Sequence, residues 1–249
     1  MELCLFQLLT NSVIILLVII VSLPDASKVA TSISNLWPSG TYGLPRSMLG
    51  CPQSHDFEWK TGWRYQDTED SYPNNRYSNI SFHMDTMIWK NNLNKTFCIK
   101  GKNISEEKGG AWPKGQFCIY KKGDCPKQLS EGFIYWDDED SNNRNSIEGT
   151  LPDGIYNHDT KIFFCCRTDG NKSDPIILPV NKPFYLLAYG SSECQQVKGA
   201  LVTEEFIQYD TEDDSSNKDA WGGTHPNVSH EVPGSSTLVI TYCYYDSKS

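Results

Sequence analysis

Short apolar segments separated by turn-forming residues run along most of the chain. The segments 115–121, 132–136, 160–166, 184–189, 205–209 and 237–245 are rich in aromatic and β-branched residues. Clusters of Gly, Asn, Asp and Pro, such as 121–124 and 141–145, separate such segments. Short strands bounded by turn clusters, with little helical periodicity, are typical of all-β proteins. The pattern therefore predicts an all-β fold with frequent turns.

One pattern occurs three times: an aromatic residue precedes a cluster of acids, with one cysteine upstream and another downstream. The acidic clusters lie in 65–70, 136–140 and 209–214. Trp37 and Trp112 open the first two units, and the third opens more loosely at 178–184. The units cover about 37–98, 112–166 and 178–243, a period of roughly 55–65 residues. Because repeats of this size stack on one another, they predict three small sheets around a pseudo-threefold axis.

The cysteines fit the same repeat. The chain has nine, and eight remain when Cys4 in the N-terminal apolar segment is set aside. An even number favours disulfides formed in an oxidising compartment. Aligning 160–166 on 237–243 without a gap matches Cys166 with Cys243, and adjacent cysteines in a strand point to opposite faces. The repeat then predicts four disulfides: Cys51–Cys98, Cys118–Cys165, Cys125–Cys166 and Cys194–Cys243.

The N-terminal segment is typical of a signal peptide. Residues 13–23 are apolar apart from Ser22, and this run is shorter than the ~20 residues that span a bilayer. We expect a signal peptide at 1–26, secretion to the extracellular space and no transmembrane anchor. Sequons for N-glycosylation fit that compartment, and they lie at Asn79, Asn94, Asn103, Asn171 and Asn227. The net charge of −9 argues against nucleic acid as a partner.

The acidic clusters are the sharpest candidate for chemistry. Closely spaced carboxylates supply the hard oxygen ligands that Ca²⁺ prefers, although no cluster matches an EF-hand loop. Acids after a strand also form solvated turns, which is the role we expect, with calcium as the alternative and no other cofactor. The candidate ligands are Asp67, Glu69, Asp70, Asp137, Glu139, Asp140, Asp210, Glu212 and Asp213. Nothing singles out a buried acid pair or a nucleophile motif, so we expect no enzymatic activity.

The chain is rich in aromatic residues that can hold sugar rings, with seven Trp and thirteen Tyr. Trp37 and Trp112 occupy equivalent positions in the repeat, which predicts packing in the core. Other aromatic residues are not repeated in this way or lie beside the acids. The candidates for a ligand surface are Trp59, Trp63, Tyr65, Trp89, Tyr209 and Trp221.

Several motifs resemble the C-terminal domain of the apextrin family. They include Trp-Pro-Ser-Gly-Thr-Tyr-Gly-Leu-Pro at 37–45, Trp-Pro-Lys-Gly-Gln-Phe-Cys at 112–118 and Asp-Thr-Lys-Ile-Phe-Phe-Cys-Cys-Arg at 159–167. The resemblance covers residues 36–245. A weaker resemblance, in the segment from Cys125 to Cys166, is to the vitelline-membrane outer-layer proteins. Those are β-prisms of three Greek-key sheets, so the resemblance implies a pseudo-threefold β-prism, with a β-trefoil as the alternative.

The family resemblance also implies a function. The chain is similar to domains that recognise bacterial cell-wall glycoconjugates in innate defence. The resemblance implies peptidoglycan or muramyl peptides as the ligands. The mechanism would be non-catalytic, with other glycans and extracellular proteins as further partners. The alternative is a structural protein of the extracellular matrix or of secretory granules.

Overall fold

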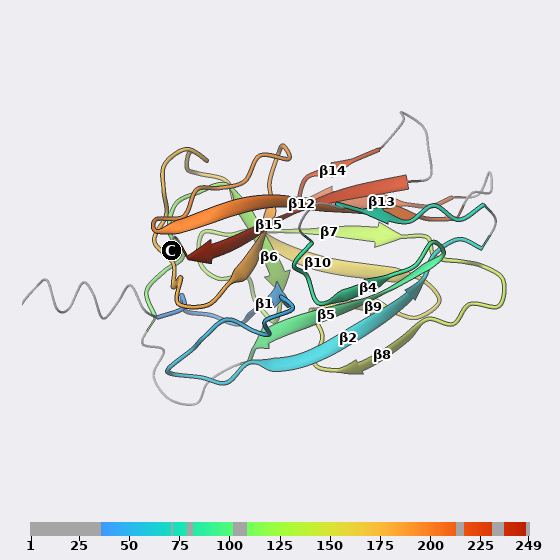
Figure 1. The fold of residues 1–249 in the computed structure, drawn as a ribbon, viewed down its shortest axis with the longest axis horizontal. Coiled ribbons are helices and arrows are strands. Elements are labelled where there is room, and N and C mark those ends of the chain that lie inside the picture. Colours follow the sequence, from blue (N-terminus) through green and yellow to red (C-terminus); the bar gives the residue numbers. More distant parts are fainter. Residues whose placement is uncertain are drawn as a thin grey trace, which may run out of the picture.

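The computed structural model describes residues 36–70, 72–78, 82–101, 109–212, 217–230 and 237–247. The signal peptide expected at 1–26 and the sequons at Asn79 and Asn103 lie outside these ranges. The described residues form β-strands and no helix, so the all-β prediction is confirmed. Figure 1 shows the strands grouped around a common interior.

Five strands come from each repeat unit. The first unit contains β1 (Tyr42–Pro45), β2 (Lys60–Asp67), β3 (Arg76–Tyr77), β4 (Thr86–Ile88) and β5 (Asn92–Lys100). The second contains β6 (Phe117–Lys121), β7 (Ser130–Trp136), β8 (Ser146–Gly149), β9 (Gly154–Tyr156) and β10 (Thr160–Arg167). The third contains β11 (Phe184–Ala188), β12 (Ala200–Asp210), β13 (Ala220–Gly223), β14 (Val228–Ser229) and β15 (Thr237–Ser247).

The same antiparallel pairing is repeated in every unit. The second strand pairs with the fifth, as in β2–β5, β7–β10 and β12–β15. The fourth strand pairs with the outer edge of the fifth, as in β4–β5, β9–β10 and β14–β15. The six strands expected from apolar patterning all belong to the second and third units and coincide with β6, β7, β10, β11, β12 and β15.

The third strand of each unit leaves that unit and pairs with a neighbour. β8 of the second unit pairs with β2 of the first, and β13 of the third pairs with β7 of the second. β3 of the first unit pairs with β12 of the third and completes the cycle. The three separate sheets that we expected are therefore joined into one 15-stranded sheet. The β-prism assignment and its β-trefoil alternative stay predictions.

Two of the exchanged contacts depend on glycine. A Cβ on Gly132 of β7 would lie 2.3 Å from the carbonyl oxygen of Thr224, which follows β13. At the equivalent position of β2, a Cβ on Gly62 would lie 2.4 Å from the carbonyl oxygen of Thr150, which follows β8. Real Cβ atoms do not approach carbonyl oxygens this closely, so glycine permits the exchanged strand to approach.

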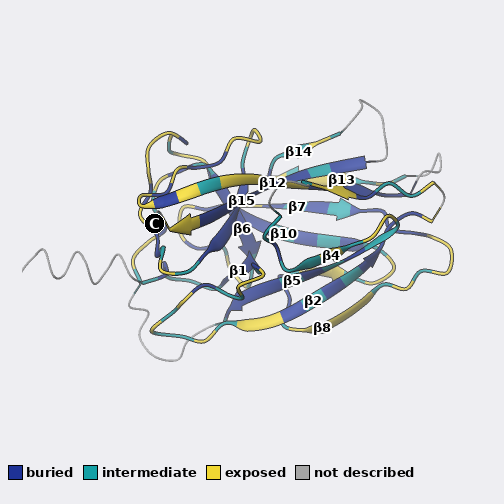
Figure 2. Cartoon of the chain, in the orientation of Figure 1, coloured by how far each residue is buried: buried dark blue, intermediate teal, exposed yellow. Residues whose placement is uncertain are grey.

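The first strands, β1, β6 and β11, lie between two hydrophobic cores. β6 pairs with β10 along one edge, and the two ends of its other edge pair with β1 and β11. Side chains alternate along these strands, so that Phe117 and Ile119 enter one core while Cys118 and Tyr120 enter the other. Figure 2 shows that β6, β10 and β15 consist mostly of buried residues, whereas β8 and β13 are mostly exposed. Trp37 and Trp112, which we expected to pack in the core, are both buried.

Two of the four predicted disulfides are correct and two are wrong. The structure contains Cys51–Cys98 and Cys194–Cys243 as expected. It joins Cys118 to Cys166 and Cys125 to Cys165, so the predicted Cys118–Cys165 and Cys125–Cys166 pairs are not formed. Cys118 and Cys166 are directly opposed on β6 and β10, whereas Cys165 faces the other core together with Cys125.

The error is a shift of one residue in the alignment of the repeats. The residue before each acidic cluster pairs with a residue of the fifth strand: Gln66 with Leu93, Trp136 with Thr160 and Tyr209 with Leu238. Counting five residues onward from each partner gives Cys98, Cys165 and Cys243. The threefold set of disulfides is therefore Cys51–Cys98, Cys125–Cys165 and Cys194–Cys243, with Cα–Cα distances of 5.6, 5.6 and 5.7 Å. Cys118–Cys166 is the additional disulfide of the second unit.

Candidate functional site

The three acidic clusters lie together, where the second strands end. The backbone N–H of Glu139 donates to the carbonyl oxygen of Asp67 over 3.2 Å. In the same way, the N–H of Glu212 donates to the carbonyl oxygen of Asp137 over 3.0 Å. The first cluster thus contacts the second, and the second contacts the third, through backbone atoms.

The first acid of each cluster fixes the strand that arrives from another unit. The Asp67 carboxylate accepts the N–H of Arg144 over 2.9 Å, and its own N–H donates to the Asn145 side chain over 2.7 Å. Asp137 makes the same pair of bonds with the N–H of Lys218 and the side chain of Asp219, at 2.7 and 2.8 Å. Asp210 makes them with the N–H of Asn74 and the side chain of Asn75, at 2.6 and 2.8 Å. These donors and acceptors immediately precede β8, β13 and β3.

The glutamates of the second and third clusters also bond to a neighbouring unit. A carboxylate oxygen of Glu139 accepts the N–H of Asp70 over 2.9 Å, and one of Glu212 accepts the N–H of Asp140 over 3.2 Å. The corresponding third pair is Glu69 with Asp213, and Asp213 lies outside the described residues. The acidic clusters therefore act as locks between units.

The acidic clusters are not the solvated turns that we expected. The solvent-exposed fraction is only 4, 3 and 4% for Asp67, Asp137 and Asp210. The glutamates of the clusters are also buried, namely Glu69, Glu139 and Glu212. Only Asp70 and Asp140 among the described candidates are exposed. One carboxylate oxygen of each of Asp67, Asp137 and Asp210 already accepts a backbone N–H, whereas Ca²⁺ needs six to eight oxygen ligands. In the part of the chain that the structure describes, no group of three or more His, Cys, Asp or Glu side chains is arranged to hold a metal ion.

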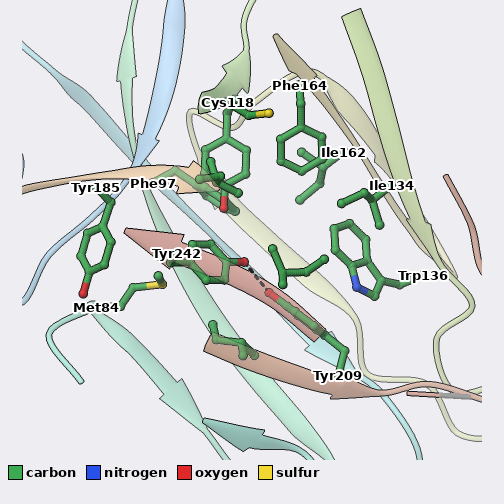
Figure 3. Close-up of a cluster of buried hydrophobic side chains, with 14 of the residues drawn as sticks. Met84, Phe97, Cys118, Ile134, Trp136, Ile162, Phe164, Tyr185, Tyr209 and Tyr242 are labelled. Carbon is green, nitrogen blue, oxygen red and sulfur yellow. Dashed lines mark hydrogen bonds between the residues drawn. The ribbon is translucent and has the colours of Figure 1, made fainter. Parts of the chain in front are cut away.

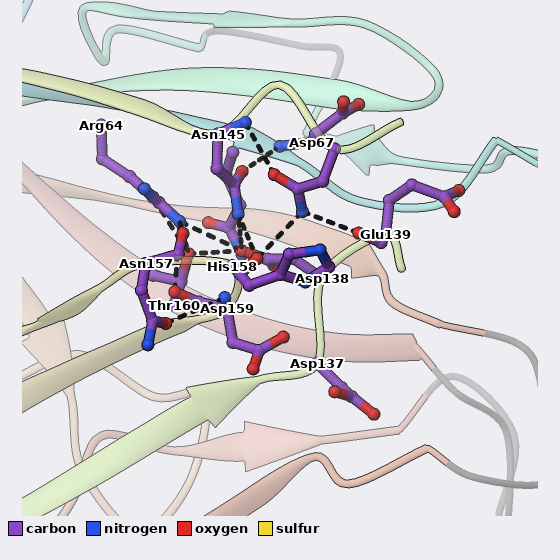
Figure 4. Close-up of polar contacts among 12 residues, drawn as sticks. Arg64, Asp67, Asp137, Asp138, Glu139, Asn145, Asn157, His158, Asp159 and Thr160 are labelled. Atoms are coloured by element: carbon purple, nitrogen blue, oxygen red, sulfur yellow. Dashed lines mark hydrogen bonds and ion pairs between the residues drawn. The ribbon is translucent and has the colours of Figure 1, made fainter. Parts of the chain in front are cut away.

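The second unit carries a buried charge within this region (Figure 4). Asp138 stands where the other units have Thr68 and Thr211, and its carboxylate is fully buried. Gln66 and Asn145 donate to it over 2.7 and 2.8 Å, and the hydroxyl of Thr160 also donates. Burial raises the pKa of Asp138 to about 7, although these bonds favour the charged form.

The partner of that charge is Arg64 of the first unit. Its Nη2 lies 3.5 Å from Oδ2 of Asp138, and the guanidinium also donates to Thr160 and to the carbonyl oxygens of Asn157 and Asp159. Both side chains are buried. The pair has no exposed surface at which a ligand could bind, so it contributes to structure rather than to recognition.

The aromatic candidates do not form one site. The prediction that Tyr209 lies on a ligand surface is wrong. Tyr209 is fully buried, and its hydroxyl is 2.7 Å from that of Tyr242 (Figure 3). Trp59 packs at the edge of the core against Trp37 and Phe57, with ring centroids 5.8 and 4.9 Å away. Trp221 on β13 is 38% exposed and lies 5.5 Å from the His230 ring.

Three candidates do share a surface. Trp63 and Tyr65 alternate on β2 with Arg64, which faces the interior, so both point outward. The ring of Trp89 lies 6.2 Å from that of Tyr65 and is 45% exposed. Asn94, a predicted glycosylation site, pairs with Tyr65 across β5. The outer face of the first sheet is thus aromatic with polar neighbours.

The other two sheets carry an aromatic residue at the same place. Trp63, Phe133 and Phe206 each lie three residues before the residue that precedes the acidic cluster. All three point outward from the second strand of their unit and are partly exposed. Phe133 and Phe206 were missed from the sequence, although aligning the repeats on the acidic clusters would have found them.

A comparison with protein-family models decides the family. The model described as the C-terminal domain of apextrin matches residues 37–245. The chain belongs to the apextrin C-terminal domain family. No curated protein and no solved structure matches it. The resemblance seen in the sequence motifs is therefore confirmed over most of the chain.

The apextrin-type domain carries features that fit an extracellular protein. It contains four disulfides. Of the sequons within the described residues, Asn171 is exposed, whereas Asn94 and Asn227 are partly buried. The search for a long apolar helix that could cross a membrane found none among the described residues.

Proposed function

We propose that this apextrin-type protein is a secreted, non-catalytic receptor for bacterial cell-wall glycoconjugates, with peptidoglycan or its muramyl peptides as the ligand. The observation that carries the proposal is the repeated outward position of Trp63, Phe133 and Phe206. Each ring is held on a strand within a sheet, so little conformational entropy is lost when a ligand packs against it. Family membership supports the same function.

The three rings suit a weak, repeated ligand. The apolar face of a sugar ring packs on an aromatic face, while neighbouring polar groups bind hydroxyls. Glu148 lies across from Trp63 on β8, and Ser78 contacts the backbone of Phe206. Peptidoglycan presents the same sugars many times, so three weak platforms on one chain gain affinity through effective concentration.

The test is a pull-down of the secreted protein on insoluble peptidoglycan at physiological salt. We expect the wild type to bind and Trp63→Leu to bind more weakly by about three- to tenfold, as expected when one aromatic contact is lost. Ile177→Ser is a matched control, because Ile177 is 56% exposed and lies outside the proposed faces.

Two results would contradict the proposal. A wild-type protein that stays in the supernatant would instead match a structural role in the extracellular matrix or in granules. Release of soluble muropeptides from the pellet would show that the protein is an enzyme.

A further inference from the structure

The outer face of the second sheet differs from the other two because a cation lies among its aromatic rings. Phe133 and Phe163 are directly opposed on β7 and β10, with ring centroids 6.3 Å apart. Lys161 lies one outward position along β10, and its Nζ is 3.7 Å from the centre of the Phe133 ring and 5.3 Å from that of Phe163. The ammonium group thus lies on the aromatic surface.

Lys161 has no acidic partner among the described residues. The nearest acid along the chain is Asp159, directly before β10, and its carboxylate accepts the hydroxyl of Tyr135 over 2.6 Å. Glu131, on the same face of β7, pairs with Lys121 at 3.4 Å. An unpaired ammonium on a chain with a net charge of −9 is a local site of positive potential.

The exchanged strand β13 leaves this surface open. Its residues opposite Tyr135 and Phe133 are Ala220 and Gly222, which have little or no side chain. A Cβ on Gly222 would lie 3.0 Å from Cε1 of Phe133, so a larger residue would press on the ring. The two rings therefore form a shelf that no large side chain of β13 covers.

A hollow adjoins the opposite side of the shelf. It has a volume of about 600 Å³ and is lined by Phe163, Lys121, Lys122, Thr150 and Tyr156, among others. Asp153 holds both lysines of the hollow, at 3.7 and 3.4 Å. Lys161 is thus the cation of this surface that remains available to a ligand.

We propose that the shelf formed by Phe133, Phe163 and Lys161 binds a carboxylate-bearing sugar, with the ring on the aromatic faces and the carboxylate on Lys161. Charge complementarity favours this occupant, because the Lys161 ammonium has no acidic partner and can form an ion pair with a carboxylate of the ligand. The inference deepens the proposed function, on which it rests for the source of the sugar, because a muramic acid residue without a peptide carries a free lactyl carboxylate, and a muramyl peptide carries its carboxylate on the peptide. It assigns the acidic part of that ligand to the second sheet.

The test measures binding of three soluble probes to the intact protein: muramyl dipeptide, a neutral N-acetylglucosamine tetramer and an oligogalacturonate. We expect Lys161→Met to weaken binding of both acidic probes by about fivefold, the loss expected for a partly exposed charge pair, and to leave the neutral probe unchanged. Lys161→Arg keeps the charge and should bind within about twofold of the wild type. Lys198→Met is the matched control, because Lys198 is exposed in the third unit.

The outcomes separate this inference from the proposed function. Equal binding of the acidic probes by Lys161→Met and the wild type overturns the inference, and leaves the proposed function intact if insoluble peptidoglycan is still bound. Absence of peptidoglycan binding together with Lys161-dependent binding of oligogalacturonate overturns the proposed function and supports the inference. Equal melting temperatures of the variants show that any loss comes from the site rather than from unfolding.

Discussion

The guanidinium of Arg64 and the carboxylate of Asp138 form a fully buried ion pair between two repeat units, with 3.5 Å between Nη2 and Oδ2. The register of the repeats places Ile134 and Ile207 at the positions equivalent to Arg64, and Thr68 and Thr211 at those equivalent to Asp138. The pair therefore departs from the threefold symmetry: the second and third units have isoleucine where the first has Arg64, and the first and third have threonine where the second has Asp138.

This pair predicts a strongly non-additive double mutant. Arg64→Ile leaves a buried carboxylate without its cation, and Asp138→Thr leaves the reverse, so each should lower the free energy of unfolding by about 3–5 kcal/mol. The double variant restores the residue types of the other units and should be close to the wild type in stability. Denaturant unfolding with the disulfides intact measures all three. Additive losses would contradict the assigned coupling.

Lys95 predicts a specific dependence of stability on pH. Its ammonium is buried near the rings of Trp136 and Tyr209, 4.6 and 4.7 Å from their centres. Burial lowers its pKa from 10.5 to about 7. Between these two values the unfolded chain keeps the proton that the native state has lost, so this group makes stability rise with pH in that window.

The matched variant is Lys95→Ile, which copies Ile162 and Ile240 at the equivalent positions. We expect it to be more stable than the wild type at pH 7, because a desolvated cation is removed. Its advantage should decrease as the pH is raised towards 10. An advantage that is independent of pH over this range would show that Lys95 does not titrate as described.

The disulfide assignment predicts which cysteine pairs can be removed without leaving a free thiol. Cys118→Ala with Cys166→Ala removes one complete disulfide, so a thiol reagent should find no reactive cysteine in the denatured mature protein. Cys118→Ala with Cys165→Ala breaks two different disulfides. This variant should leave the thiols of Cys166 and Cys125 reactive, unless these two cysteines form a new disulfide. Two reactive thiols in the Cys118→Ala, Cys166→Ala variant and none in the Cys118→Ala, Cys165→Ala variant would instead support the pairing first expected from the sequence.

The acidic locks predict a difference between buried and exposed acids of the same cluster. Asp67→Ala leaves the N–H of Arg144 without its acceptor and should destabilise the protein by about 1–3 kcal/mol. Asp70→Ala is the matched control, and a change within about 0.5 kcal/mol is expected because its side chain is exposed. Hydrogen exchange should also rise in β8 only in Asp67→Ala.

Calcium provides a separate check on the same clusters. Because one carboxylate oxygen of each of Asp67, Asp137 and Asp210 already accepts a backbone N–H, adding Ca²⁺ should leave the melting temperature unchanged. A ligand that binds the native state raises that temperature by mass action, so a clear increase would show that the acids hold the ion.

The sequence predicted the repeat and six strands of the second and third units, because those six strands have the expected apolar pattern. The strands of the first unit escaped detection. β5 carries Lys95 and Lys100, and β2 carries Arg64. All three are buried, so charged residues occupy interior positions and interrupt the apolar pattern. Arg64 and Lys95 are buried because other units supply their partners, and a local pattern contains no information about those partners. Lys100 is held within its own unit by the carbonyl oxygen of Pro38.

The role of the acids could not be found from local sequence for the same reason. The strands that cover them, β3, β8 and β13, are two to four residues long, and each comes from a neighbouring unit. The misassignment of Tyr209 has a simpler cause. Tyr65 lies two residues before the first acid of its cluster and Tyr209 only one, so the two rings point to opposite faces of their sheets.

The central claim is that the outer faces of the sheets, and not the acidic clusters, recognise the cell wall. The most direct measurement is the fraction bound to insoluble peptidoglycan by a variant that combines Trp63→Leu, Phe133→Leu and Phe206→Leu, compared with the wild type at matched melting temperatures. The account predicts that the wild type is retained and that the triple variant remains in the supernatant. Equal retention of the two proteins, or no retention of the wild type, would contradict it.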